Sequence, residues 1–210
     1  MRKTKLVMGE YYHIYNRGTD KRNIFMDTND LFRFWESLFD FNQTEPIGSI
    51  YEFSFKKKSG EVNKIKPLVQ FIAYCLNPNH FHFLITPFQE KGIEKFMQRL
   101  GNGYTKYFNN RHKRDGVLFQ GKFRSKHIGS NEYLLHLSAY INGNDKLGHR
   151  MSELSKSSLP EFLEQVSGKK LCNTEIVLGQ FNNKKEYENF VIESLKDIKL
   201  RKEMIKELEN

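Results

Sequence analysis

Cysteine is scarce in this chain of 210 residues, in which Cys75 and Cys172 lie far apart. Two cysteines at that separation match no zinc-ligand spacing, so the sequence argues against a zinc finger and against a disulfide-rich secreted scaffold. No apolar run approaches the roughly 18 residues that a membrane-spanning helix needs. Residues 1–8 are basic but lack the apolar stretch of a signal peptide. These absences predict a cytoplasmic protein.

Acidic residues are the minority among the charged ones: 25 Asp and Glu stand against 34 Lys and Arg, which gives a net charge of +9. A basic balance favours a polyanionic partner, most simply nucleic acid, because each neutralised phosphate releases counterions. Aromatic residues make up 14% of the chain, and rings interleaved with basic side chains suit single-stranded nucleic acid, whose bases stack on them. The charge alone is equally compatible with a generally basic protein, and many rings must be core.

The most informative stretch is residues 77–85, Asn-Pro-Asn-His-Phe-His-Phe-Leu-Ile. One apolar run enters the Pro-Asn turn and a second leaves it, which predicts two adjacent strands. Side chains at positions i and i+2 share a face of a strand, so His80 and His82 point the same way. Two neutral imidazoles in that arrangement can chelate a divalent metal. The pair by itself is equally compatible with a solvated or nucleic-acid-facing strand.

The other segments before residue 130 predict a ferredoxin-like α+β sandwich. Hydrophobic periodicity predicts strands and helices in the order strand, helix, strand, strand, helix, strand. Besides the two central strands, the segments are residues 11–18 (strand), 28–42 (helix), 92–109 (helix) and 117–128 (one or two strands). Residues 43–66 predict a projecting hairpin or loop. Helices would cover one face of an antiparallel sheet, the other face would be free for ligands, and the His-x-His strand would lie in its middle.

A third helix is predicted over residues 131–143, with Ser130 as its N-cap. Tyr140 and Asn144 are one turn apart and therefore share a face. His80-Phe81-His82 followed by Tyr140-Ile141-x-x-Asn144 resembles the HUH single-tyrosine transposases, most closely the REP-associated tyrosine transposases, which are insertion-sequence transposase-like. The resemblance covers residues 11–147, and the further matching segments are residues 12–18, 73–74, 78–80, 107–109, 116–120 and 123–125.

This resemblance implies a metal-dependent single-stranded DNA endonuclease and strand transferase that acts on hairpin-bearing DNA. His80, His82 and the side-chain oxygen of Asn144 would bind Mg²⁺ or Mn²⁺. Tyr140 would attack the scissile phosphate and form a 5′-phosphotyrosine intermediate. The expected DNA-binding residues are Asn16, Arg17, Arg111, Lys122, Arg124 and Lys126.

Two positions depart from the family pattern. Asn77 stands where the family usually has Met, and Asp145 stands where it usually has Pro. The first change, in a turn, is expected to be harmless, whereas the missing helix stop could alter how Asn144 points. His136, one turn before Tyr140, is a weak candidate for helping the phenol to ionise, because a phenol has a pKa of about 10.

The domain prediction places a transposase-like catalytic domain at residues 1–148 and a helical C-terminal extension at residues 149–210. Helices are expected over residues 159–166, 174–181 and 184–208. The extension either helps to hold DNA or caps and stabilises the catalytic domain. The expected partner is single-stranded DNA with a hairpin, with no membrane, and a monomer is preferred over a homodimer.

A non-catalytic or domesticated nucleic-acid-binding module on the same fold is the alternative. Such a module, like an RNA-recognition domain, would stack bases on sheet aromatics and bind without metal. It explains the charge and the aromatic residues but leaves the pairing of the His-x-His and Tyr-x-x-x-Asn motifs to coincidence. A phosphodiesterase with paired histidine motifs would need a second His-x-Ser/Thr element, which does not occur. The sequence therefore favours the transposase.

Overall fold

The computed structural model describes residues 5–59, 66–144 and 153–208. Five strands form one antiparallel sheet in the order β4-β1-β3-β2-β5, so β3 with its histidine pair lies at the centre, as predicted. The strands are β1 Tyr11–Arg17, β2 Val69–Asn77, β3 His80–Pro87, β4 Arg124–Ile128 and β5 Lys156–Ser157.

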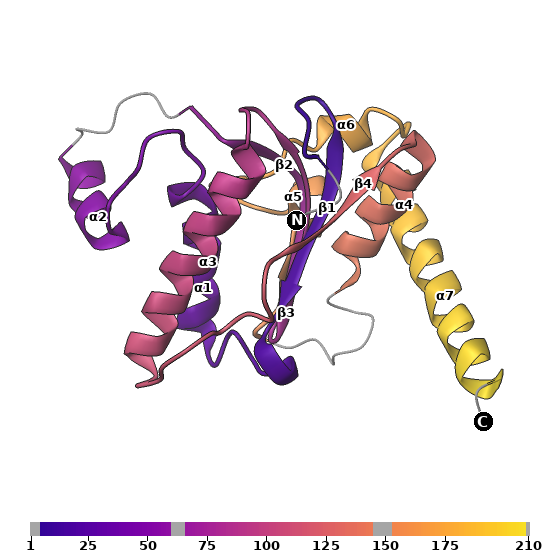
Figure 1. Ribbon diagram of the computed structural model, residues 1–210. Coiled ribbons are helices and arrows are strands. Elements are labelled where there is room, and N and C mark those ends of the chain that lie inside the picture. Colours follow the sequence, from indigo (N-terminus) through magenta and orange to yellow (C-terminus); the bar gives the residue numbers. More distant parts are fainter. Residues whose placement is uncertain (1–4, 60–65, 145–152, 209–210) are drawn as a thin grey trace.

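Helices cover both faces of the sheet. In Figure 1 the sheet is seen nearly edge-on, with α1 and α3 on its left and α4 and α7 on its right. The helices are η1 Thr19–Lys21, α1 Thr28–Asp40, α2 Ile50–Lys58, α3 Gly92–Arg111, α4 Asn131–Asn142, α5 Leu159–Phe162, α6 Glu175–Leu178 and α7 Lys184–Leu208. The predicted α+β class with a ferredoxin-like sheet is confirmed. The second face, however, is not left open along its whole length.

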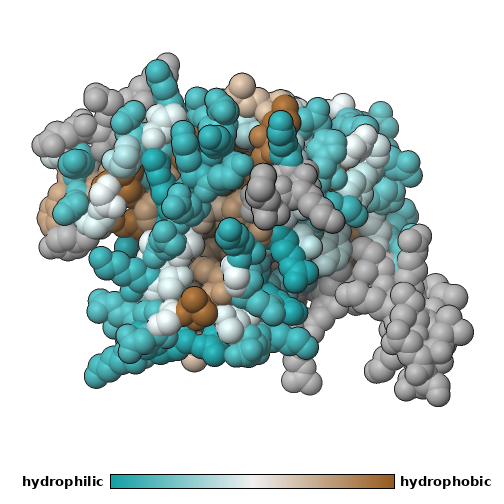
Figure 2. Space-filling view, viewed as in Figure 1, coloured by the Kyte–Doolittle hydropathy of each residue, from teal (hydrophilic) through white to brown (hydrophobic). Residues whose placement is uncertain are grey.

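Strand alternation separates two cores. Phe81 and Phe83 of β3 are buried against α1 and α3, whereas Leu84 belongs to a second core that includes α4 and α7. His80 and His82 point to the second side because they alternate with the two phenylalanines. Hydrophilic residues dominate the outer surface in the view of Figure 2.

One predicted element is wrong. Residues 50–58 form helix α2 rather than one arm of a hairpin, and the expected return strand falls on residues 60–65, outside the described part of the chain. The backbone N–H of Glu52 donates to Ser49 Oγ at 3.1 Å, and the backbone N–H of Ser49 donates to Glu52 Oε2 at 3.2 Å. This reciprocal pair is a capping box, a helix start signal that outweighs the alternation of residues 51–55.

The ends of α1 and α3 are joined by a buried carboxylate. Asp30 is fully buried; it accepts hydrogen bonds from the Met26 backbone N–H at 2.9 Å and from the Tyr107 hydroxyl at 3.3 Å. It also pairs with Arg111 and lies 2.8 Å from His112 Nε2. Arg111 makes a second ion pair with Asp27 at 2.6 Å. Arg111 therefore has a structural task that the sequence did not indicate.

The C-terminal residues contact the rest of the fold through β5, which pairs with β2, and α7, which packs against α4. Gly143, just after α4, makes this packing possible, because an added Cβ would lie 2.4 Å from Leu195 Cδ1. The division into a catalytic domain and an extension stays a prediction. Within the described residues, no helix combines the length and apolarity required to cross a membrane.

Candidate active site

The predicted metal and nucleophile residues meet where β3 begins and α4 ends. The rings of His80 and His82 have centroids 5.1 Å apart, and the Tyr140 ring lies 5.7 Å from that of His82. Asn144 Oδ1 is 3.4 Å from His80 Nε2. Side chains separated by some sixty positions in the sequence are thus brought into one cluster.

Helix α4 is fixed in a way that presents Tyr140 to the histidines. Ser130 caps it by accepting a hydrogen bond from the Tyr133 backbone N–H at 3.2 Å. Leu134, Leu137 and Ile141 form its buried stripe, as predicted. Asn144 lies 8% exposed beyond the helix end and points toward His80, whereas Asp145 lies outside the described residues.

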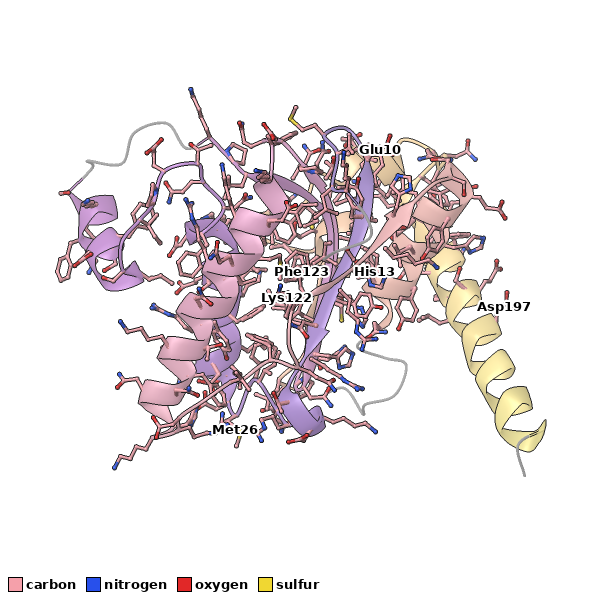
Figure 3. All side chains as sticks on the ribbon, viewed as in Figure 1. Glu10, His13, Met26, Lys122, Phe123 and Asp197 are labelled. Atoms are coloured by element: carbon pink, nitrogen blue, oxygen red, sulfur yellow. The ribbon has the colours of Figure 1, made fainter. Side chains whose placement is uncertain are left out.

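Both imidazoles are held through their Nδ1 atoms. His80 Nδ1 lies 2.6 Å from Asn79 Oδ1, an acceptor only, so the proton sits on Nδ1 and the lone pair on Nε2. His82 Nδ1 lies 2.9 Å from Nε2 of His13 on β1. If His82 donates in this contact, its Nε2 likewise carries the lone pair that a metal requires. His13, labelled in Figure 3, is a site residue to which the sequence assigned no role.

Burial keeps His13 and His82 neutral. Burial lowers the pKa of His82 well below its usual value, and the neighbouring His13 and His80 add to the shift. Burial, with a smaller contribution from the charge of Lys126, lowers the pKa of His13 to about 4. Neutral imidazoles are the form that binds a cation.

The burial of His13 predicts that the fold loses stability in acid. Between pH 6.5 and about 4 the unfolded chain binds a proton at His13 that the folded chain excludes, so the free energy of unfolding falls as the pH is lowered through this window. Below it the cost from His13 reaches about 3 kcal/mol. Urea unfolding across this pH range should show a flatter dependence for His13→Gln than for wild type. His136→Gln, which removes an exposed histidine, is the control. An equal flattening of the pH dependence in that variant would contradict the assignment to His13.

Tyr140 needs help to ionise. Its pKa is raised above the usual value by burial, while its hydrogen bond with Asn144 acts in the opposite direction. His136 does not supply that help, because it is exposed and its ring packs against Phe190 of α7 at 5.1 Å. A cation beside the phenol would stabilise the phenolate.

The donor atoms fit a divalent cation. Among the residues that the structure describes, no group of three or more His, Cys, Asp or Glu side chains could hold a metal. A cation at the histidine pair would therefore need a further ligand such as an amide oxygen. His80 Nε2 and Asn144 Oδ1 both lie within hydrogen-bonding distance of one donor, Asn77 Nδ2, at 3.1 and 2.7 Å. The lone pairs of the two acceptors therefore point to one position, as the lone pairs of two ligands point to a bound cation. Imidazole with amide oxygen suits Mn²⁺ or Mg²⁺.

A small cavity lies beside this cluster, and it shares lining residues with a larger one. The smaller, of about 370 Å³, is lined by His80 and His82 together with Asn16, Arg17 and Arg124. The larger, of about 1600 Å³, runs between α3 and residues 116–125, shares Asn16 and Arg124, and adds Lys122 with Phe119 and Phe123. Lys122 and Phe123 are labelled in Figure 3 on the segment that leads into β4. The smaller cavity thus places basic side chains beside the histidine pair, and the larger cavity adds basic and aromatic side chains on the α3 side.

Four of the six predicted DNA-binding residues line these cavities, and two do not. Asn16, Arg17, Arg124 and Lys122 line the cavities. Lys126 is exposed on β4 with its ammonium group 4.7 Å from the centre of the Tyr133 ring, and it lines neither cavity. Arg111 is held by Asp27 and Asp30. A DNA contact by either of these two stays a prediction.

The fold and the cluster define a class of protein: an α+β sandwich whose central strand carries a histidine pair facing a tyrosine on an adjacent helix. Residues 51–144 match the family described as IS200-like transposases, and the matched range contains both histidines, Tyr140 and Asn144. No curated protein sequence matches the chain.

Two solved structures are similar. A REP-associated tyrosine transposase bound to a REP hairpin has 13% sequence identity and a TM-score of 0.52, over 80% of this chain and 92% of that one. A candidate transposase from Deinococcus radiodurans R1 has 14% identity and a TM-score of 0.38, over 67% of this chain and 95% of that one. The first likeness shows a shared fold. With the family match it confirms the resemblance to the IS200-like and REP-type tyrosine transposases, and the family match supports a function as a transposase acting on DNA.

Proposed function

We propose that this protein is a metal-dependent endonuclease and strand transferase for single-stranded, hairpin-bearing DNA, with Tyr140 as the nucleophile. The observation that carries the proposal is the packing of Tyr140 against His82 while Asn144 reaches His80. His80, His82 and Asn144 would hold Mg²⁺ or Mn²⁺. When bound, the cation would polarise the scissile phosphate and favour the phenolate.

The chain's own residues position the reaction. DNA enters along the basic cavities, where Arg17 and Arg124 neutralise phosphates beside the histidine pair. The Tyr140 oxygen attacks phosphorus and the bond from phosphorus to the 3′-oxygen breaks. The phenolic proton passes to solvent, and the leaving 3′-oxygen takes up a proton from solvent. The products are a 5′-phosphotyrosine and a free 3′-hydroxyl. Attack by another 3′-hydroxyl on the phosphotyrosine reverses the step and joins the ends without ATP.

A denaturing gel with labelled single-stranded hairpin DNA from the flanks of the gene tests this function. Wild type with Mn²⁺ should give a covalent protein–DNA band that EDTA prevents. His82→Ala should lose the band, because one imidazole ligand is gone, while retaining DNA binding at the cavities. A band of equal intensity in His82→Ala or in EDTA would contradict a metal-dependent step. Binding without metal and without any covalent band would favour the non-catalytic module.

The cellular location and the oligomeric state are also parts of this proposal. We expect a cytoplasmic protein that works as a monomer, since the described chain brings its own Tyr140 against its own histidines. Light scattering of the full-length protein should give the mass of one chain, 25.0 kDa. A mass of two chains would instead indicate a homodimer.

A further inference from the structure

Asn77, the residue that departs from the family pattern in the turn, is wholly buried at the centre of the cluster. It ends β2, opposite His80 in the register of β2 and β3. Its amide nitrogen lies 3.1 Å from His80 Nε2 and 2.7 Å from Asn144 Oδ1. Its amide oxygen accepts a hydrogen bond from Ser155 Oγ at 3.2 Å. Neither the sequence nor the comparisons give Asn77 a role.

The three atoms around this point have the spacing of neighbouring metal ligands. His80 Nε2 and Asn144 Oδ1 are 3.4 Å apart, and the Asn77 amide atom completes the triangle at 3.1 and 2.7 Å. Adjacent ligands of an octahedral cation bound at 2.0–2.1 Å are about 3.0 Å from one another. The triangle therefore matches one face of an octahedral shell.

We propose that Asn77 is a further ligand of the divalent cation, through its amide oxygen. This inference rests on the proposed metal site. Without metal, the amide nitrogen faces His80 and Asn144 and satisfies both acceptors. With metal, the amide turns over and presents its oxygen, a change that preserves packing because the two ends of an amide are nearly equal in size.

Ser155 makes either orientation of the amide possible. A hydroxyl both donates and accepts, so Ser155 Oγ donates to the amide oxygen in one state and accepts from the amide nitrogen in the other. Ser155 directly precedes β5, in the segment predicted as the C-terminal extension. It is a positioning residue, and through it the extension holds the orientation of a metal ligand.

Mn²⁺ binding to the DNA-free protein, measured from the electron paramagnetic resonance of free Mn²⁺, tests the proposal without any DNA cleavage. Asn77→Met has similar bulk but offers a thioether, which hard cations disfavour. It is expected to weaken Mn²⁺ binding at least about 10-fold, in the range seen when metal-site residues are lost. Asn77→Asp keeps an oxygen, adds charge and should bind Mn²⁺ at least as tightly as wild type. Thermal unfolding of each variant reports whether it is folded.

The outcomes separate this inference from the proposed function. If Asn77→Met binds Mn²⁺ as tightly as wild type or more tightly, the amide only occupies the site and is not a ligand. If Asn77→Met does not fold, the Mn²⁺ affinity of Asn77→Asp tests the proposal instead. Weaker Mn²⁺ binding by Asn77→Asp than by wild type would contradict a ligand role for this position. If wild type binds Mn²⁺ no better than His82→Ala, the metal site itself fails, and the proposed function fails with it.

Discussion

Tyr140→Phe is expected to lower the rate of DNA cleavage at least about 10³-fold, because the substitution removes the attacking oxygen and leaves the ring in place. The ring contact with His82, at 5.7 Å between centroids, and the burial of α4 should both persist. Binding of hairpin DNA should change little, since the basic side chains proposed to hold it lie on β1 and β4 and in the segment before β4. Single-turnover cleavage with Mn²⁺, alongside a filter-binding titration, measures both quantities.

Tyr11→Phe is the matched control for this loss. Tyr11 begins β1 and packs against the second core, at the opposite end of the strand from Asn16 and Arg17 of the cavity. Its cleavage rate should equal that of wild type. A Tyr140→Phe enzyme that cleaves at a rate near that of Tyr11→Phe would show that another group attacks the phosphate.

Asp30→Ala is expected to lower the free energy of unfolding by about 1–3 kcal/mol, the usual cost of leaving buried hydrogen-bond donors without their acceptor, since Arg111 itself is partly exposed. Asp30 is fully buried, and its carboxylate bonds Arg111, His112, the Tyr107 hydroxyl and the Met26 backbone N–H. The substitution leaves these donors without their acceptor at the junction of α1 and α3. Urea denaturation measures the change.

Asp20→Asn is the control for Asp30→Ala, because Asp20 has a left-handed backbone (φ 55°) that Asn tolerates and Ala does not. The Asp20 side chain is 84% exposed and pairs with Arg22 only at 3.5 Å. Exposed pairs of this kind contribute about 0–1 kcal/mol. A loss at Asp30 no larger than that at Asp20 would contradict a structural role for the cluster, and it would return Arg111 to the residues available for DNA.

The parts of the site that could be predicted from sequence depend on local periodicity. Alternation along one strand placed His80 and His82 on one face, and helical spacing placed Tyr140 near Asn144. The family resemblance then linked strand and helix. These inferences needed no knowledge of which strands pair.

The parts that could not be predicted depend on pairing across the fold. His13 reaches His82 only because β1 pairs with β3, with Tyr15 opposite His82. Arg111 is chemically suited to bind phosphate. Its carboxylate partners, however, become visible only where α1 and α3 meet in the fold. The departure at Asn77 was expected to be harmless, yet this residue ends β2 and its amide contacts two predicted metal ligands.

The helix in place of a hairpin has a local cause. Alternation of apolar and polar residues over positions 51–55 favoured a strand, but Ser49 and Glu52 start a helix by capping each other. The signal was present in the sequence as Ser-x-x-Glu. Such a helix start signal outweighs a short alternating run.

Mass spectrometry of the covalent adduct tests the central claim most directly. Wild-type protein incubated with Mn²⁺ and single-stranded hairpin DNA would be digested with nuclease and protease, and the peptide that carries the residual nucleotide sequenced. The account predicts a phosphodiester on the oxygen of Tyr140, attached to the 5′ end of the DNA. A nucleotide on any other residue, or a 3′ linkage at Tyr140, would contradict it.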